Sequence, residues 1–561
     1  MSDDLPGDGY REARRQLDAP RDIAELLVGR RQLWQERAAE RGTRTRKYPE
    51  PFEVVAPSAV DIPEGWRWVT VSHLAFLDVG FAFKSAEFQD QGIRLLRGEN
   101  VEPGSLRWTE TRYWPKSRVE EVRHLLVEPG EIILALDRPI VAAGLKLARV
   151  KPTDVPALLV QRVMRFKMVT ATDAPYLYWC LFHHRFIDFL AHDGMTGSDL
   201  PHITGTGVAE FPIPVPPPRQ QSAIVRQIEV LLGQVDRAKG RLAQVPLILE
   251  RFRQAVLAAA CSGDLTTEWR DEHPSWQDDA TDFKSKLAVA PRGKNLAEPA
   301  EAELDVPDGW PVVSLAAIAT HLTSGSRAWS PYYRDDGFGT FVMAQNVRPM
   351  RFDQSHRQGV APPANDPERL RTTVHEGDIL VTIVGANTGD VCRVDVPVRD
   401  HFVCQSVALA RLTVPAFAPF LELWLNSVRH GQWLYQEWAY GEGRPHLSFD
   451  QLRSTPIAIP GQPEQSEILR RVSNLFALAD TIERRVQAAT ARADRLPQAV
   501  LSKAFSGELV PTEAELARAE GWTYETAKEP LARVTAAGAP APMKQRASPT
   551  SRKPAGRRAS R

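Results

Sequence analysis

The sequence contains few cysteines, and their spacing excludes the common cysteine-based sites. The four residues, Cys180, Cys261, Cys392 and Cys404, form no CxxC pair and have no cluster of histidines nearby. Tetrahedral zinc sites and disulfide frameworks need such clusters or pairs. We therefore expect four buried free thiols, with neither a metal site nor a disulfide network.

Long uncharged apolar runs are also missing. No stretch reaches the roughly 18 apolar residues of a membrane-spanning helix, and the opening segment MSDDLPGDGYREARRQLDAP lacks the apolar region of a signal peptide. We therefore expect a cytoplasmic protein with no membrane partner.

Neither sign of charge is in excess, because 70 Lys and Arg residues balance 70 Asp and Glu residues. Proteins that bind nucleic acid commonly carry a basic excess, so a net charge of zero does not by itself favour this function. The charge is segregated: residues 267–305 hold ten acidic and five basic residues, and residues 544–561 hold seven basic residues and no acid. The composition of this Pro/Ser/Arg-rich tail predicts disorder.

Signatures of catalysis are missing as well. A methyltransferase would need an NPPY-like loop and a Gly-rich loop for the methyl donor, and a translocase would need GxxxxGK[ST] for nucleotide phosphates. PPAND at Pro362, ITGTGVAE at Ile203 and RGKN at Arg292 lack the required order or spacing. The acidic residues 267–305 lack the strand framework on which a nuclease holds magnesium. We therefore expect no catalytic site in this chain.

A long internal repeat is the main feature that is present. IPEGW at Ile62 recurs as VPDGW at Val306, a shift of 244 residues. The same shift relates Ala174-Pro175 to Ala418-Pro419, Pro201-His202 to Pro445-His446, Gln221-Ser222 to Gln465-Ser466, QAVL at Gln254 to QAVL at Gln498, and Ser262-Gly263 to Ser506-Gly507. EPGEIIL at Glu128 matches HEGDILV at His375 with a shift of 247, so the second copy carries a short insertion. The period is too long for a solenoid and indicates a tandem duplication.

Each copy begins with an expected globule of strands and turns. Short runs of apolar and β-branched residues (TVSHLAFLDV, EIILAL, RVMRF) alternate with Gly and Pro between Trp66 and about Pro216. One amphipathic helix is expected inside each globule, at Pro175–Ala191 and Pro419–Trp438. The expected fold class is α+β, with two mixed α/β domains in a tandem pseudo-symmetric repeat.

A long amphipathic helix follows each globule. After PIPVPPPRQQ, apolar residues recur at alternating spacings of four and three, which define the a and d positions of a heptad. The expected seam consists of Ile224, Ile228, Leu231, Val235, Leu242, Leu249, Ile468, Val472, Leu475, Ile482, Val486 and Leu496. Gly263 and Gly507 should end the helices, while Pro246 and Pro497 should kink or break them. The two stripes would most simply pack as an antiparallel coiled coil; packing of each stripe on its own globule is the alternative.

These patterns divide the chain into seven segments. They are an N-terminal extension (1–61), a first globule (62–216), a first helix (217–265), an acidic linker (266–305), a second globule (306–460), a second helix (461–510) and a C-terminal extension with a basic tail (511–561).

Two similar globules held apart by a rod are suited to reading two short sequences on one DNA duplex, where successive half-sites lie about 34 Å apart. The order of globule, proline-rich segment, long helix and SGDL or SGEL ending, at Ser262 and Ser506, resembles the specificity subunit of type I restriction-modification enzymes. The resemblance covers nearly everything from Ile62 to Pro511. It implies two target recognition domains for a bipartite, asymmetric site in double-stranded DNA, separated by helices that dock two modification subunits.

The resemblance also implies where catalysis takes place. The modification subunits, and restriction subunits recruited through them, would supply the chemistry with S-adenosylmethionine, ATP and Mg, none of which this chain is expected to bind. A coiled-coil scaffold whose globules bind protein is the alternative function, and the neutral net charge is its best support.

Candidate DNA-contacting residues follow from the chemistry of base edges. Arg or Lys suits guanine, Asn or Gln suits adenine, and further donors suit phosphates. The candidates in the first globule are Lys84, Ser85, Arg94, Arg97, Asn100, Gln161, Arg162 and His202. Those in the second globule are Ser326, Arg327, Trp329, Tyr332, Tyr333, Gln345, Asn346, Gln405, Arg444 and His446. Glycines in SGSRAWSPYYRDDG would allow a close-approach loop, whereas the repeated Pro-His pair is equally compatible with a structural role.

Overall fold

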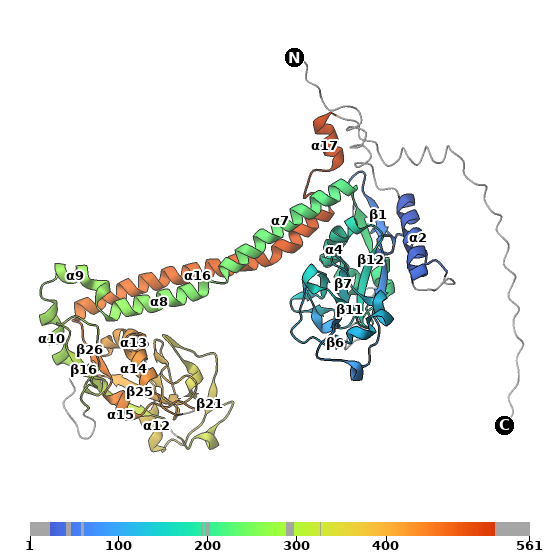
Figure 1. Ribbon diagram of the computed structural model, residues 1–561. Helices are drawn as coiled ribbons and strands as arrows, with labels where there is room; N and C mark the ends of the chain where they lie inside the picture. Colours follow the sequence, from blue (N-terminus) through green and yellow to red (C-terminus); the bar gives the residue numbers. More distant parts are fainter. Residues whose placement is uncertain are drawn as a thin grey trace, which may run out of the picture. The chain divides into compact units, whose positions relative to one another are not determined.

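The computed structural model describes residues 23–40, 47–57, 61–191, 195–196, 202–287, 297–325, 327–441 and 443–521. They form two compact units: the first holds the described residues up to Lys239 and from Arg492 onward, and the second spans Gly240–Ala491. Figure 1 labels the main elements of both units. Ser326, residues 1–22 of the N-terminal extension and the basic tail lie outside the described residues.

The first unit is built on a four-stranded antiparallel sheet in the order β10-β7-β12-β2. Its strands are β2 (Ala75–Val79), β7 (Ile132–Ala135), β10 (Leu147–Arg149) and β12 (Val163–Met168). A second sheet has the order β11-β3-β6, from β3 (Ile93–Leu96), β6 (Tyr113–Trp114) and β11 (Ala157–Leu159), with β11 parallel to β3. A further pair joins β1 (Arg67–Thr70) to β15 (Pro212–Val215).

The second unit repeats this strand order. Its four-stranded sheet, β23-β22-β25-β17, consists of β17 (Ala319–Ser324), β22 (Ile379–Thr382), β23 (Val391–Arg393) and β25 (Val407–Leu412). A second sheet has the order β21-β18-β24, with β18 (Gly339–Val342) between β21 (Gln358–Val360) and β24 (His401–Val403). A further pair joins β16 (Val312–Ser314) to β26 (Pro456–Ala458). Two sequences that differ strongly between these strands therefore fold on one frame.

The central strands explain why the apolar runs are continuous rather than alternating. In β7, Ile132 and Leu134 pack into one hydrophobic core, while Ile133 and Ala135 pack into another on the opposite face. A strand that is buried on both faces needs apolar residues at every position. The run EIILAL thus reflects a sheet covered on both sides.

The helix expected inside each globule is broken into two. The first unit has α4 (Ala174–Phe182) and α5 (His184–Phe189), and the second has α13 (Ala418–Asn426) and α14 (Gly431–Trp438). The prediction of one continuous helix is wrong because His183 adopts an extended conformation, with ψ 142°, and ends α4. Its buried ring lies 3.0 Å from Ser502 Oγ, so the break serves a tertiary contact that the apolar pattern does not reveal.

Three long helices follow the globules: α7 (Pro218–Leu242), α8 (Val245–Cys261) and the 44-residue α16 (Gln462–Phe505). Pro246 lies at the start of α8, so the predicted break is confirmed there. Pro497 lies inside α16 without ending it, so no break occurs at that proline. Gly263 and Gly507 follow the helix ends with φ of 78° and 82°, the left-handed conformation expected of C-terminal glycines.

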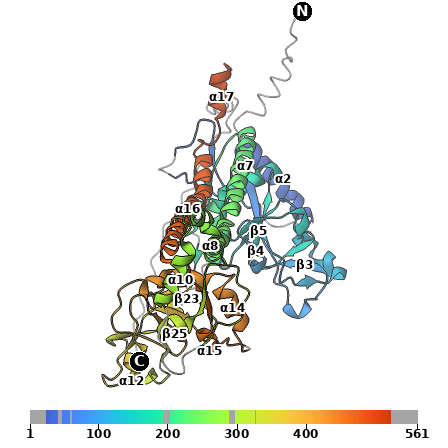
Figure 2. The ribbon, with the colours of Figure 1, turned by 90° about the vertical axis from the view of Figure 1, so that its left-hand side faces the viewer.

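Within each unit, α16 packs antiparallel to the other long helix. In the first unit, Lys239 of α7 pairs with Asp494 at 2.7 Å, while Ile224 shares a core with Phe505. In the second unit, Arg253 of α8 contacts both Asp480 and Glu483 at 2.8 Å. α8 and α16 lie side by side in Figure 1 and in Figure 2.

The expected apolar seam is only partly covered. Ile224, Ile228, Val235, Leu249, Ile468 and Val472 are buried, and Leu231, Leu242, Leu475 and Val486 are half-buried. Ile482 and Leu496 are 37% and 40% exposed, contrary to the expectation of a closed seam. The apolar stripe therefore continues beyond the surface that the helices of this chain cover for each other.

The N-terminal extension contributes a packed helix, α2 (Ile23–Glu40), which lies beside the first unit's sheet in Figure 1. Leu26 enters the core, and the buried Arg30 donates from Nε to the Ser72 carbonyl at 2.7 Å while stacking over the ring of Phe76. In the second unit, the acidic residues before the second globule form α9 (Thr267–Glu272) and α10 (Trp276–Leu287), and Phe283 of α10 is buried. Both segments thus fold against their units.

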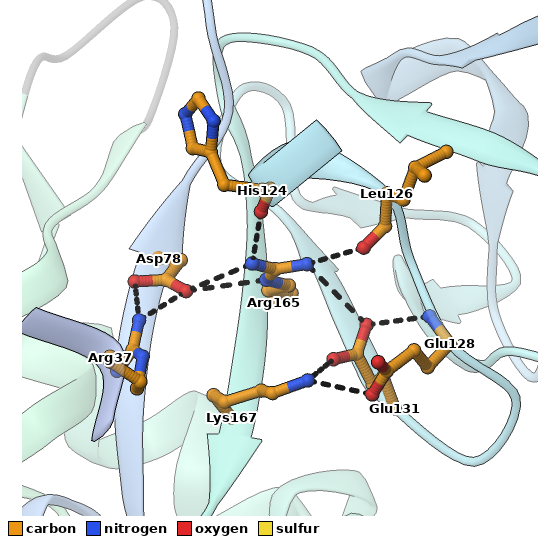
Figure 3. Close-up of polar contacts among 8 residues, drawn as sticks. All are labelled: Arg37, Asp78, His124, Leu126, Glu128, Glu131, Arg165 and Lys167. Atoms are coloured by element: carbon orange, nitrogen blue, oxygen red, sulfur yellow. Dashed lines mark hydrogen bonds and ion pairs between the residues drawn. The ribbon is translucent and has the colours of Figure 1, made fainter. Parts of the chain in front are cut away.

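A polar network joins α2 to the sheet, as shown in Figure 3. Asp78 of β2 accepts hydrogen bonds from Arg37 at 2.5 Å and from Arg165 at 3.3 Å. Arg165 is only 5% exposed and also donates to the carbonyls of His124 and Leu126, both at 2.7 Å. The buried guanidinium is satisfied by groups from two separate parts of the chain.

The four cysteines are free and buried, as the sequence predicts, and burial raises the pKa of each thiol. Among the described residues, no helix is both long and apolar enough to cross a bilayer.

The buried His183 predicts a pH-dependent stability of the first unit. Burial, followed by the neighbouring His184 and Arg185, lowers its pKa from 6.5 to about 4. The unfolded chain therefore binds the proton more readily between these values, so stability is complete above about pH 6.5 and falls towards pH 4. We expect a loss of about 2 kcal/mol at pH 5 relative to pH 7, measured by urea unfolding.

The His183→Gln variant should lose this part of the pH dependence, because it has no imidazole to protonate. His356→Gln, at an exposed histidine, is the control and should keep the slope of the parent chain. An unchanged slope in His183→Gln would contradict the assignment.

Candidate DNA interface

Loops at one end of the first unit's sheets come together, and we define residues 80–85, 136–143, 161–162 and 202–203 as the first loop cluster. Gln161 N donates to the Phe81 carbonyl at 2.8 Å, Leu136 N to the Arg162 carbonyl at 2.9 Å, and Ile203 N to the Leu136 carbonyl at 3.0 Å. These backbone bonds fix the loops to one another. Segments that are far apart in the sequence therefore form one surface.

The second unit has a corresponding second loop cluster, formed by the described residues of 325–329, 383–389, 404–406 and 440–447. Gly325 N bonds to the Cys404 carbonyl at 3.0 Å, Ile383 N to Ser406 at 2.8 Å, and Leu447 N to Ile383 at 2.9 Å. A Cβ atom at Gly325 would lie 1.6 Å from the Val403 carbonyl oxygen, so only glycine permits this close approach. This close approach joins two backbone segments of the protein, whereas the loop expected from the sequence would approach DNA, so that expectation stays a prediction.

Several predicted DNA contacts lie in these clusters. The first cluster contains Lys84, Ser85, Gln161 and Arg162 as exposed residues, together with the backbone of His202, whose side chain is outside the described part. The second contains the exposed residues Arg327, Gln405 and Arg444, together with the half-buried His446, which packs on Tyr440. Gln161 and Gln405 occupy equivalent positions, so each cluster presents one amide suited to adenine.

Each cluster also contains at least one exposed arginine that forms no ion pair with a described acidic side chain. Arg162 pairs with Asp137 at 2.6 Å, but Arg138, Arg327 and Arg444 have no ion pair with any described acid. Unpaired arginines on exposed loops retain their donors for phosphate oxygens or guanine edges. A chain of zero net charge can thus present basic groups locally.

The first cluster differs from the second in backbone geometry. Residues 136–146 connect β7 to β10 and include a short hairpin of β8 (Ile140–Val141) and β9 (Gly144–Leu145), whereas the shorter segment 383–390 connects β22 to β23. Arg138 has a φ of 44°, and its counterpart, Gly385, has a φ of 115°. The left-handed region is unfavourable for arginine, so this conformation costs about 1–3 kcal/mol.

Three predicted contacts in the first unit, Arg94, Arg97 and Asn100, lie outside the cluster, on β3 and in the turn that follows it. Asn100 is 2% exposed; its Oδ1 accepts from Arg97 N, and its Nδ2 donates to the Arg107 carbonyl. The prediction that Asn100 contacts DNA is therefore wrong. Arg94 donates to the carbonyls of Thr153 and Val155, and Arg97 donates to the backbone carbonyl of Glu110, so these side chains support loops.

Similar corrections apply in the second unit. Asn346 is 2% exposed and repeats the bonding of Asn100, and Trp329 is 1% exposed with Nε1 bonded to Asp366. Both predictions are wrong, because these two side chains are buried and make their hydrogen bonds inside the unit. Tyr332 and Tyr333 pack against the core of this unit, whereas Gln345 is exposed outside the loop cluster.

No group of three or more His, Cys, Asp or Glu side chains in the described ranges has a geometry suited to a metal ion.

Comparison with known proteins identifies the family. The model of the type I restriction modification DNA specificity domain matches residues 64–247. The chain is 30% identical over 463 residues to the EcoBI specificity subunit of Escherichia coli, covering 80% of this chain and 87% of that one. The chain belongs to the type I restriction enzyme specificity subunits. It is also 27% identical over 464 residues to the EcoKI specificity subunit of E. coli strain K12, covering 81% and 91% of the two chains.

A solved structure supports the fold of this specificity subunit. One chain of a structure that describes complex assembly and conformational transition of the type I R-M system aligns with a TM-score of 0.54 at 17% identity. The alignment covers 80% of this chain and 99% of that chain.

The structure of the specificity subunit adds residues that the sequence did not single out. Arg138 and the exposed apolar residues Phe81, Ile140 and Val141 lie in the first loop cluster, and Tyr440 lies in the second. Ile140 and Val141 are 40% and 41% exposed on the hairpin. Segment 136–146 is longer than its counterpart 383–390. The sequence contains a sign of this difference, because the repeat shift falls from 247 at Glu128 to 244 at Ala174.

Proposed function

We propose that this chain is the DNA-recognition subunit of a type I restriction-modification complex and reads a bipartite, asymmetric site. In this proposal the two units contain target recognition domains, and the long helices form an antiparallel coiled coil that separates them. The observation that carries the proposal is that equivalent loop clusters, built on one strand order, present different side chains. Two domains that share a fold but expose different side chains can each recognise a different half-site.

The partners proposed for the chain follow from what it presents and what it lacks. Leu247, Ile248 and Leu478 on the second unit's long helices are between 53% and 58% exposed, next to Ile482. Apolar surface of this kind suits permanent subunit contacts. We expect two modification subunits to bind the helices and to recruit restriction subunits.

Catalysis in the proposed complex belongs to those partners. S-adenosylmethionine, ATP and Mg would be bound by the modification and restriction subunits, and the complex would act in the cytoplasm, where it reaches DNA. The chain itself would supply sequence recognition and no catalytic group.

The proposal is tested by expressing the chain with its modification subunit and mapping methylated adenines across the host genome by single-molecule sequencing. A motif of two unlike short parts separated by a fixed spacer is the expected result. Exchanging the first globule for that of a relative should change one part only. A stable complex that methylates no such motif would contradict DNA recognition and favour a protein-binding scaffold.

A further inference from the structure

The hairpin of β8 and β9 in the first loop cluster ends in a run of uncharged side chains. Residues 140–143, which we call the hairpin tip, have the sequence Ile-Val-Ala-Ala, and all four are exposed. Ala142 and Ala143 connect the two strands, while Ile140 and Val141 are 40% and 41% exposed. Four adjacent apolar side chains therefore face outward on a surface whose other predicted contacts are polar.

The base of the hairpin is anchored in the first unit. Pro139 and Leu145, which flank the tip and Gly144, are both buried. Lys146 N donates to the Pro139 carbonyl at 2.7 Å, and Ala135 N donates to the Lys146 carbonyl at 3.0 Å. The tip is thus held in a defined position by the sheet below it.

Strand pairing places the two larger side chains of the tip on different faces. Ile140 is opposite Leu145, and Val141 is opposite Gly144. Residues that are directly opposite share a face of an antiparallel pair, and successive residues alternate between faces. Ile140 therefore shares the face of Leu145, which enters the core, whereas Val141 lies on the other face. Its cross-strand neighbour is a glycine, so no side chain on the opposite strand covers Val141.

The charges around the hairpin favour DNA as the group that covers the tip. Three acidic side chains act on Lys146 at its base, and each is paired with an arginine: Asp137 with Arg162, Glu99 with Arg97, and Glu102 with Arg107. Arg138, two residues before the tip, is exposed and has no ion pair with a described acid. An apolar tip beside an unpaired arginine suits the apolar and acceptor groups of a base edge next to phosphates.

The second unit has a different surface at the corresponding place. Its segment 383–390 is shorter and carries the polar residues Asn387 and Thr388. The apolar tip therefore distinguishes the first loop cluster from the second. A feature present in one cluster can recognise a group in one half-site only.

The chemistry of the major groove identifies that group. The groove is wide enough for a two-stranded β-ribbon, and thymine differs from the other standard bases there by its C5-methyl group, which apolar side chains contact. We propose that the hairpin tip enters the major groove and that Val141 contacts the methyl group of a thymine in the half-site read by the first unit. This inference rests on the proposed function and names one group that the function would recognise.

The test measures binding of the full chain, in complex with its modification subunit, to duplexes that carry the mapped motif. Deoxyuridine replaces each thymine, on either strand, of the motif part read by the first globule. Each replacement removes only a methyl group. We expect one of them to weaken binding of the parent complex by about 3- to 10-fold, because an apolar contact is lost.

The Val141→Ala complex should bind the unmodified duplex about 3- to 10-fold more weakly than the parent and should be insensitive to that same replacement. Val428→Ala is the matched control, because Val428 is 45% exposed and lies outside both loop clusters. It should keep the affinity of the parent and its sensitivity to deoxyuridine.

Three results would overturn the inference while leaving DNA recognition intact. They are an affinity that no replacement changes, a sensitivity that persists in Val141→Ala, and a first motif part that contains no thymine on either strand. Equal weakening on all duplexes by Val141→Ala, with parent-specific 2-aminopurine fluorescence at one base step, would instead show a tip that separates base pairs and would also overturn it. A complex with no preference for the mapped motif would contradict the proposed function itself, and this inference with it.

Discussion

Replacement of Arg138 by alanine in the assembled complex is expected to weaken binding to the cognate duplex by about 10- to 100-fold. The guanidinium is exposed in the first loop cluster and has no ion pair with a described acid. Its left-handed backbone, with φ of 44°, fixes the direction in which the side chain leaves the hairpin. A bidentate contact from such a side chain to a base contributes about 1–3 kcal/mol of discrimination.

The measurement is a fluorescence-anisotropy titration of the complex with duplexes that carry the parent motif and single changes in each half. Arg138→Ala should relax discrimination in one half-site and leave the other unchanged. Arg123→Ala removes an exposed arginine outside the loop cluster and should bind like the parent chain. Equal loss of affinity for matched and changed duplexes would assign Arg138 to phosphate and not to a base.

Replacement of Asp78 by threonine is expected to lower the free energy of unfolding of the first unit by about 3–5 kcal/mol. The change leaves the guanidinium of Arg165 buried, with Glu131 at 3.9 Å as its remaining carboxylate among the contacts in Figure 3. It also removes the acid that holds Arg37 of α2. A buried charge without its partner is much less stable than an intact pair.

The second unit provides the compensating change. Strand pairing places Leu409 where the first unit has Arg165, and Thr323 where it has Asp78. The double variant Asp78→Thr/Arg165→Leu should therefore regain most of the lost stability, because an uncharged pair can replace a buried ion pair at little cost. Urea unfolding measures both variants, with Asp188→Thr as an exposed control. A double variant less stable than Asp78→Thr alone would contradict this account.

The repeat and the helices could be predicted because their signals are local or directly comparable. A shift of 244 residues aligns Trp66 with Trp310, and both tryptophans donate to the residue at the equivalent position of a long helix. The heptad spacing predicted the long helices, and glycine chemistry predicted their ends at Gly263 and Gly507. These features depend on backbone propensities and on a period that is visible in one dimension.

The candidate site could be predicted only in part, because residue type does not report burial. Asn100 and Asn346 match the chemistry of adenine recognition, yet each closes a turn inside its unit. Arg138 was overlooked because nothing in RPIVAAG indicates a hairpin held beside Gln161 and Arg162. Whether a polar side chain is exposed depends on strand pairings between distant segments, which composition does not encode.

The sequence by itself determined that this protein contains an internal repeat and that each copy combines a mixed globule with a long amphipathic helix. The order of these parts also indicated the family. Only the tertiary structure decided which polar residues face solvent, how α2 is anchored through Asp78, and which ion pairs the second copy forms. The physical reason is that periodicity and repetition are properties of neighbouring or aligned residues, whereas the burial and pairing of charges arise only when separate segments share one core.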